Sequence, residues 1–198
     1  MGKTVGVVAT QPQVKAGCLD INSSTKIAMF VQFCDSFNIA IVNLVDVPGY
    51  LPGFDQERGG IIRHGSKLLY AYSNAQVPKI SLILRKAYGG AYIALASKSL
   101  GYDSVFAWPE AEIGVMGAEQ ALNLFQTEEM AKISDKDREE RIKEYKKNHI
   151  DIFKVAATDK IDQVIAKKDT RKVLISVLKA LEYKTYVSTG KRHGNIPL

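Results

Sequence analysis

The sequence predicts an α/β fold in which strands and helices alternate around a largely parallel sheet. Short runs of β-branched and aliphatic residues alternate with longer segments that carry apolar residues at helical spacing. The run at residues 39–45 is predominantly apolar, as expected for a strand in a sheet covered on both faces. With 198 residues, 46% of them apolar and 24% charged, the chain can fill the core of one domain.

The predicted elements follow from local patterns along the chain. β-Branched or apolar runs indicate strands, and amphipathic segments indicate helices. The expected strands are residues 4–10, 39–45, 80–84, 104–108, 112–115 and 162–165. The expected helices are a first helix ending near residue 38, residues 61–74 and 91–100, a segment beginning near residue 117, and residues 170–184.

The first helix is predicted from a capping residue and one apolar face. Asn22 or Ser23 can cap its N-terminus, because both side chains accept hydrogen bonds from free backbone N–H groups. Apolar residues then recur at spacings of three and four, which places them on one side of a helix. The positions on this face are Ile27, Phe30, Val31, Cys34 and Phe37.

Three segments depart from the alternating pattern. Residues 46–53 contain two prolines and two glycines, which break regular structure. Residues 127–147 are dense in charges of both signs and predict a long solvated helix or a helix pair. The tail at residues 191–198 contains glycine and proline and is expected to be irregular.

Composition restricts the class of protein. No stretch approaches the roughly 20 apolar residues that span a membrane, and no targeting leader is recognisable. Cys18 and Cys34 form neither a disulfide framework nor a CxxC metal site, so we expect a reducing, cytoplasmic compartment, with the mitochondrial matrix also compatible. The net charge of +6 does not indicate nucleic-acid binding, because the basic residues are interleaved with acids. A positive surface would equally attract a phosphorylated small molecule such as a coenzyme A thioester.

A glycine corner separates the strand at residues 80–84 from the following helix. Gly89 and Gly90, followed by Ala91, let the backbone turn with almost no side chain in the way. Such a turn leaves free N–H groups at a helix N-terminus, where the helix dipole favours negative charge. The corner can therefore hold an oxyanion that forms during a reaction. The alternative is a tight turn whose glycines serve only packing.

Side-chain chemistry gives weaker candidates. His64, His149 and His193 are far apart and lack zinc-ligand spacing, and the pair His64 and Ser66 lacks a GxSxG motif. The acids Glu110, Glu112 and Glu119 flank residues 114–117 and are candidates for acid–base groups, or for ordinary capping and solubility. No GxGxxG or Walker motif supports nucleotide binding. A site built from the backbone remains the best candidate.

Longer motifs resemble the carboxyltransferase subunit of biotin-dependent acyl-CoA carboxylases, of the propionyl-CoA carboxylase or methylmalonyl-CoA decarboxylase type. They occur in family order over nearly the whole chain. The motifs are QPQV and AGCLD within residues 11–20, LVDVPG at 44–49, GIIRHG at 60–65, RKAYGGAY at 85–92 and HGNIPL at 193–198.

The resemblance implies a ClpP/crotonase-like fold of stacked ββα units. It implies that residues 1–198 correspond to the C-terminal, biotin-side domain, with a charged helical segment at about 127–148 and without the N-terminal acyl-CoA domain. The cofactor would be carboxybiotin on a partner protein, and the substrate an acyl-CoA. Expected partners are an N-terminal carboxyltransferase domain, a biotin carboxyl carrier protein or biotin carboxylase subunit, and further copies of the chain in stacked trimers.

The resemblance also assigns site residues. Gly90 and Ala91 are the expected catalytic donors, whose N–H groups would bind the ureido oxygen of biotin. The cofactor would be contacted by Gly89, Gly90, Ala91, Val47, Pro48, Gly49 and Tyr50. Tyr92 and Ile93 would border the acyl pocket, with simple core packing as the alternative for Ile93. No metal is expected.

The implied function is a carboxyltransferase half-site that moves a carboxyl group between biotin and the α-carbon of a short-chain acyl-CoA, and that is inactive without the N-terminal domain. One alternative is a single-domain crotonase-type hydratase or hydrolase that uses Glu110, Glu112 or Glu119. Another is a non-catalytic assembly domain.

Overall fold

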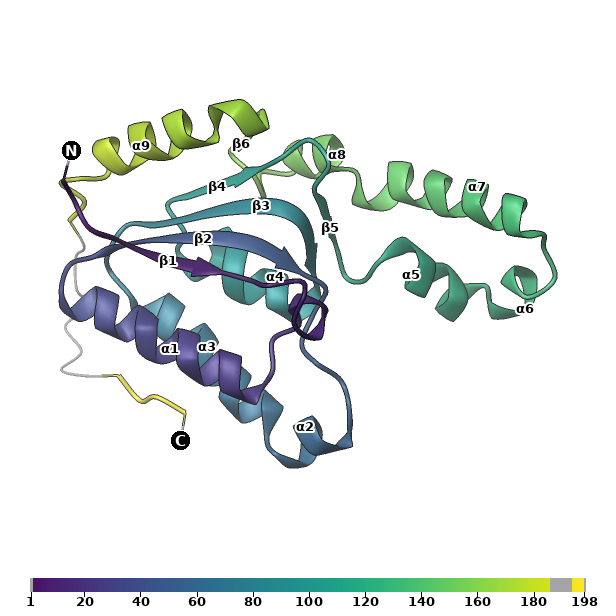
Figure 1. The fold of residues 1–198 in the computed structure, drawn as a ribbon, viewed down its shortest axis with the longest axis horizontal. Helices are drawn as coiled ribbons and strands as arrows, with labels where there is room; N and C mark the ends of the chain where they lie inside the picture. The colour runs from purple at the N-terminus through teal and green to yellow at the C-terminus, as the bar shows by residue number, and fades with distance from the viewer. Residues whose placement is uncertain (1, 186–193, 198) are drawn as a thin grey trace.

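The computed structural model describes residues 2–185 and 194–197, and a six-stranded sheet lies at its centre (Figure 1). Every strand pair in this sheet is parallel. The order is β1-β2-β3-β4-β6, and β5 pairs with β3. The strands are β1 (Val5–Ala9), β2 (Ala40–Val47), β3 (Lys79–Tyr88), β4 (Ser104–Ala107), β5 (Glu112–Gly114) and β6 (Gln163–Val164).

Helices cover both faces of the sheet. Figure 1 shows α1, α3 and α4 against one face and α9 against the other. The larger part of the core lies between the sheet and the first group, while α9 packs on a smaller cluster built around Ile80, Leu82 and Phe106. The helices are α1 (Ile21–Ser36), α2 (Phe54–Arg58), α3 (Ile61–Asn74), α4 (Gly89–Ala96), α5 (Ala118–Phe125), α6 (Thr127–Met130), α7 (Asp135–Tyr145), α8 (Ile152–Ala156) and α9 (Thr170–Ala180).

Strand β3 is the longest strand and contacts three neighbours. Its first half pairs with β2 and β4. Its last three residues pair with β5 through Lys86–Glu112, Ala87–Ile113 and Tyr88–Gly114, and β2 pairs again at Ala87. The prediction of a strand at 80–84 was therefore too short. Arg85 and Lys86 continue the strand because Asp46 holds both: it forms an ion pair with Arg85 at 2.9 Å and accepts from the backbone N–H of Lys86 at 3.2 Å.

The start of α1 differs from the prediction. The capping residue is Asp20, whose carboxylate accepts from the N–H of Ser23 at 2.8 Å while the Ser23 hydroxyl accepts from the N–H of Asp20, also at 2.8 Å. Asn22 and Ser23 therefore lie inside the helix, and capping by either is wrong. The predicted apolar face holds at Val31 and Cys34, which are buried, but not at Phe37, which is 64% exposed beyond the helix end.

Other boundaries changed where short local caps intervene. The short helix α2 was not predicted, and α4 begins at Gly89 and ends at Ala96 because Ser97 caps a separate 3₁₀ turn, Lys98–Leu100. The charged segment contains α6 and α7 followed by a π turn, Lys146–Ile150. Figure 1 shows α5, α6 and α7 projecting away from the sheet. Residues 194–197 of the tail are irregular, and the rest of it lies outside the described residues.

No helix in the described ranges is both long enough and apolar enough to cross a bilayer; α1, the longest, has 16 residues.

Candidate functional site

The glycine corner forms the junction between β3 and α4. Tyr88 is the last strand residue and the N-cap of α4, and its side chain makes no capping hydrogen bond. Gly90 and Ala91 occupy the first helical turn, where N–H groups have no acceptor within the helix. Among residues 2–185 and 194–197, neither group takes part in a turn, loop or cap hydrogen bond. Both N–H groups therefore lie at the positive end of the helix dipole.

The two glycines differ in what they require. Gly89 has a φ of +57°, and a Cβ there would lie 3.1 Å from the carbonyl oxygen of Val115. Backbone conformation and packing therefore explain Gly89 completely. Gly90 has no positive φ, and a Cβ there would make an ordinary contact of 3.4 Å with the ring of Tyr50. Neither strain nor packing requires glycine at position 90, so its missing side chain keeps the surface open in front of the amides.

Accessibility separates the two expected donors. Gly90 is exposed, whereas Ala91 is 0% exposed and its methyl group belongs to the main core. A ligand can reach the N–H of Gly90 directly. The N–H of Ala91 becomes available only if its neighbours shift.

Tyr50 forms the wall beside Gly90. Its ring lies between α3 and α4, where a Cβ on Gly65 would come within 3.2 Å of it and a Cβ on Gly90 within 3.4 Å. Its hydroxyl is buried without a hydrogen-bond partner in the described structure. Burial raises the pKa of Tyr50 to about 12, so the side chain is neutral near pH 7. Among the predicted cofactor residues 47–50, Tyr50 is the one whose side chain packs beside Gly90.

The remaining predicted site residues lie around this wall. Val47 is fully buried and pairs with Ala87. Pro48 and Gly49 are half-buried, and the carbonyl of Gly49 accepts from the N–H of Leu19 at 3.0 Å.

On α4, Tyr92 is half-buried against the core and Ile93 is 46% exposed. Ile93 follows Gly90 by three residues, so both lie on the same exposed side of the helix, about 4.5 Å apart along its axis.

A chain of polar contacts behind the corner had no counterpart in the prediction. The hydroxyl of Tyr88 donates to Glu112, whose other carboxylate oxygen accepts from Lys146 at 2.7 Å. Burial, followed by the neighbouring carboxylate, raises the pKa of Tyr88 far above its usual range. The pairing of residues 88 and 112 needs the β3–β5 register, which no local motif reveals.

The acid–base candidates are all paired. Glu110 contacts Lys167 at 3.0 Å, Glu112 is held as above, and Glu119 contacts Arg138 at 3.4 Å. Each acid therefore has an ordinary structural explanation, and no two of them share an ion-pair partner.

The histidines do not form a catalytic pair either. Nδ1 of His64 lies 2.9 Å from the hydroxyl of Thr25, while Ser66 donates to the carbonyl of Arg63 at 2.7 Å. His149 stacks on Tyr145, and His193 lies outside the described residues. Residues 2–185 and 194–197 contain no cluster of three or more side chains suited to a metal.

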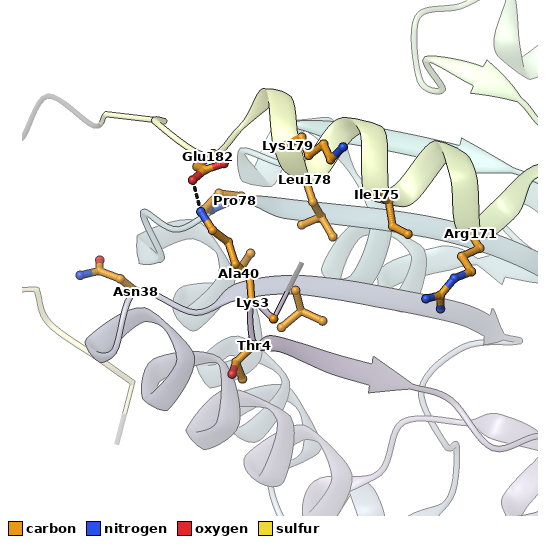
Figure 2. Close-up of a pocket in the computed structure, with 12 residues that line it drawn as sticks. Lys3, Thr4, Asn38, Ala40, Pro78, Arg171, Ile175, Leu178, Lys179 and Glu182 are labelled. Carbon is orange, nitrogen blue, oxygen red and sulfur yellow. Dashed lines mark hydrogen bonds and ion pairs between the residues drawn. The ribbon is translucent and has the colours of Figure 1, made fainter.

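A groove on the described part of the chain lies far from the corner. It encloses about 690 Å³ between α9 and the segments that precede β1, β2 and β3. Figure 2 shows Lys3 paired with Glu182 at one end and Arg171 at the other. Since these segments mark the amino ends of the strands, the ten residues of β3, about 30 Å, separate the groove from Gly89.

Comparison with known sequences identifies the family. A family model described as "Carboxyl transferase domain" matches residues 1–196. The methylmalonyl-CoA carboxyltransferase 12S subunit of Propionibacterium freudenreichii subsp. shermanii is 54% identical over 198 residues, 99% of this chain and 38% of that protein. The methylmalonyl-CoA decarboxylase subunit alpha of Veillonella parvula is 51% identical over 197 residues, 100% of this chain and 38% of that protein.

Solved structures agree. The transcarboxylase 12S hexamer with methylmalonyl-CoA and methylmalonic acid bound matches with a TM-score of 0.89 and 54% identity over 98% of this chain and 38% of that one. The β subunit of geranyl-CoA carboxylase from P. aeruginosa matches with a TM-score of 0.80 and 26% identity over 96% and 37%. The predicted crotonase-like fold is confirmed. The chain spans about two fifths of these proteins, in their C-terminal part. It belongs to the carboxyl transferase domain family, as its motifs predicted.

Proposed function

We propose that this chain is the biotin side of an acyl-CoA carboxyltransferase, with Gly90 as its principal hydrogen-bond donor. The observation that supports this role is the combination at Gly90 of an exposed free N–H and a glycine that neither backbone strain nor packing requires. The residues present fit the cofactor, since Gly90 is exposed and has no side chain of its own in front of the amide.

Carboxybiotin, when bound, would supply the carboxyl group to be transferred. Gly90 would donate its N–H to the ureido oxygen, and the dipole of α4 would favour negative charge there. Ala91 supplies a second N–H if its neighbours move on binding. One such donor contributes about 3–4 kcal/mol to lowering a barrier. The neutral ring of Tyr50 excludes water from one side, which strengthens these contacts.

The acyl substrate is proposed to lie along α4 beyond Gly90. Ile93 follows on the same exposed side and would contact a short acyl chain, with Tyr92 behind it. The relatives named for methylmalonyl-CoA and propionyl-CoA support a short-chain acyl-CoA as the substrate class. One methylene is worth only about 1–3 kcal/mol of discrimination in such a pocket, so Ile93 alone does not select the acyl group.

The proposal includes the partners of this half-site. Its relatives are more than twice as long, so a second carboxyltransferase domain is proposed to supply the acyl-CoA side. A biotin carrier would deliver the cofactor. The hexamer formed by transcarboxylase 12S supports an oligomer in which such sites lie between copies.

Titration of the ¹⁵N-labelled chain with biotin tests the proposal. We expect the amide signal of Gly90 to shift most and that of Ala91 to shift less. The signal of Gly101, which lies near the amino ends of β3 and β4, should not shift. The titration is repeated after addition of the N-terminal half of a related carboxyltransferase. If Gly90 does not shift in either sample, the assignment of the biotin site is wrong.

A further inference from the structure

The C-terminal end of α4 is held by a buried polar cluster. The side-chain amide of Asn43 donates to the carbonyl of Leu95 at 2.8 Å, and the hydroxyl of Ser81 donates to the same carbonyl. The hydroxyl of Tyr102 donates to the carbonyl of Ala94 at 2.9 Å. The last carbonyls of a helix receive no hydrogen bond from an N–H inside it. Three side chains from outside α4 therefore donate to two of these carbonyls.

The cluster is complete and closed to solvent. The second N–H of Asn43 donates to the hydroxyl of Tyr102 at 2.7 Å, and its oxygen accepts from the hydroxyl of Tyr72 at 2.8 Å. Asn43, Ser81 and Tyr72 are 0% exposed and Tyr102 is 5% exposed. Because each donor hydrogen has an acceptor, the cluster avoids the cost of burying unpaired polar groups.

The cluster interrupts otherwise apolar strands at matched positions. Asn43 of β2 and Ser81 of β3 are direct partners in the parallel register. Their neighbours along each strand are apolar. Apolar side chains at these two positions would fill the same space without polar groups that need buried partners. Tyr72 comes from α3 and Tyr102 from the segment before β4, so four different elements converge on one helix end.

We propose that Asn43, Ser81 and Tyr102 are positioning residues that fix α4 along its axis and thereby set where the N–H of Gly90 lies. This inference rests on the proposed biotin site. The helix has only eight residues, about 12 Å, and begins with two glycines and no capping side chain. Its polar anchoring therefore lies at the far end, four residues from Gly90, and a shift there moves the whole short helix.

The matched substitutions are Tyr102→Phe and Tyr72→Phe. Both remove one hydroxyl from the same buried cluster, and their rings are 5.4 Å apart. Only Tyr102→Phe removes a hydroxyl that donates to a carbonyl of α4. Tyr72 donates to Asn43, so Tyr72→Phe leaves all three side chains that donate to the helix in place. Ser81→Ala is a milder second variant that removes one donor from Leu95.

The readouts are the amide signals of Gly90 and Ala91 in the free chain and the dissociation constant for biotin. We expect Tyr102→Phe to displace both signals and to weaken biotin binding about tenfold, since small misplacement of a binding group is costly. Ser81→Ala should do the same to a smaller extent. Tyr72→Phe should lower stability but leave both signals close to their wild-type positions.

Two results would overturn the positioning role. One is unchanged Gly90 and Ala91 signals in both Tyr102→Phe and Ser81→Ala. The other is an equal displacement in Tyr72→Phe, which would indicate general loosening of the core. If the unmodified chain binds no biotin either alone or with the N-terminal half, the proposed function fails, yet the comparison of amide signals among the three variants still decides whether the cluster positions α4.

Discussion

Alanine substitutions at Gly89 and Gly90 should have opposite effects on stability, although the two residues are adjacent. Gly90→Ala places a methyl group at an ordinary 3.4 Å from the Tyr50 ring, in a backbone conformation that alanine accepts. Because alanine is the better helix former, we expect the free energy of unfolding to rise by up to about 1 kcal/mol.

Gly89→Ala should destabilise the fold. A φ of +57° costs alanine about 1–2 kcal/mol, and the 3.1 Å approach to the Val115 carbonyl adds to that cost. The two variants should therefore differ by about 2–3 kcal/mol in urea unfolding.

Function should follow the reverse order of stability. The added methyl of Gly90→Ala stands on the exposed surface in front of the free amide, so the more stable variant should lose carboxyl transfer. The N–H remains but the methyl group obstructs it, so the decrease in kcat should approach the roughly 10²–10³-fold that loss of one oxyanion donor costs. Transfer is measured with biotin, an acyl-CoA and the complementary N-terminal half. A Gly90→Ala variant that is as unstable as Gly89→Ala, or one that transfers the carboxyl group normally, would refute the reasoning.

Three further predictions concern stability. Tyr50→Phe removes a buried hydroxyl that has no partner among the described residues. The free energy of unfolding should therefore rise by about 1 kcal/mol, and Tm with it. A fall in Tm would show that the hydroxyl is hydrogen-bonded in solution. Asp20→Ala should cost about 1 kcal/mol in urea unfolding through loss of the α1 cap, whereas Asn22→Ala should have almost no effect; equal effects would contradict the assignment of the cap. Burial lowers the pKa of Lys79 from 10.5 to about 8 in the folded chain. Between these two pH values Lys79 is protonated in the unfolded chain but largely neutral in the folded one. The free energy of unfolding should therefore rise with pH over this range, by at most about 3 kcal/mol. Chemical unfolding between pH 7.5 and 10 should show this rise in the wild type and not in Lys79→Met, and parallel curves would exclude Lys79 as its source.

Local patterns were sufficient to place the six strands along the chain and to locate the glycine corner. The alternation of apolar runs and amphipathic segments depends on residues close in sequence, and the glycine pair stands out without any structure. The end of β3 was missed because the energy that keeps Arg85 and Lys86 extended comes from Asp46, about 40 residues earlier. No window of neighbouring residues contains that contact.

The site was only partly visible in the sequence for a similar reason. Two adjacent glycines look alike in a sequence, but only one has a positive φ, and that angle decides which of them serves the backbone. Asn43 offered a signal that was not used, since a polar residue inside a buried apolar run needs a partner. Its partners in α3, in β3 and before β4 become visible only when the register places Ser81 beside it.

The cluster behind α4 permits one proton order. Reversing it would require the Asn43 amide to turn over, which would set its NH₂ against the Tyr72 hydroxyl and its oxygen against the carbonyl of Leu95. Burial raises the pKa of both Tyr72 and Tyr102, so neither ionises near neutrality. The hydrogen bonds that hold the end of α4 therefore do not depend on the ionisation of either tyrosine near neutral pH.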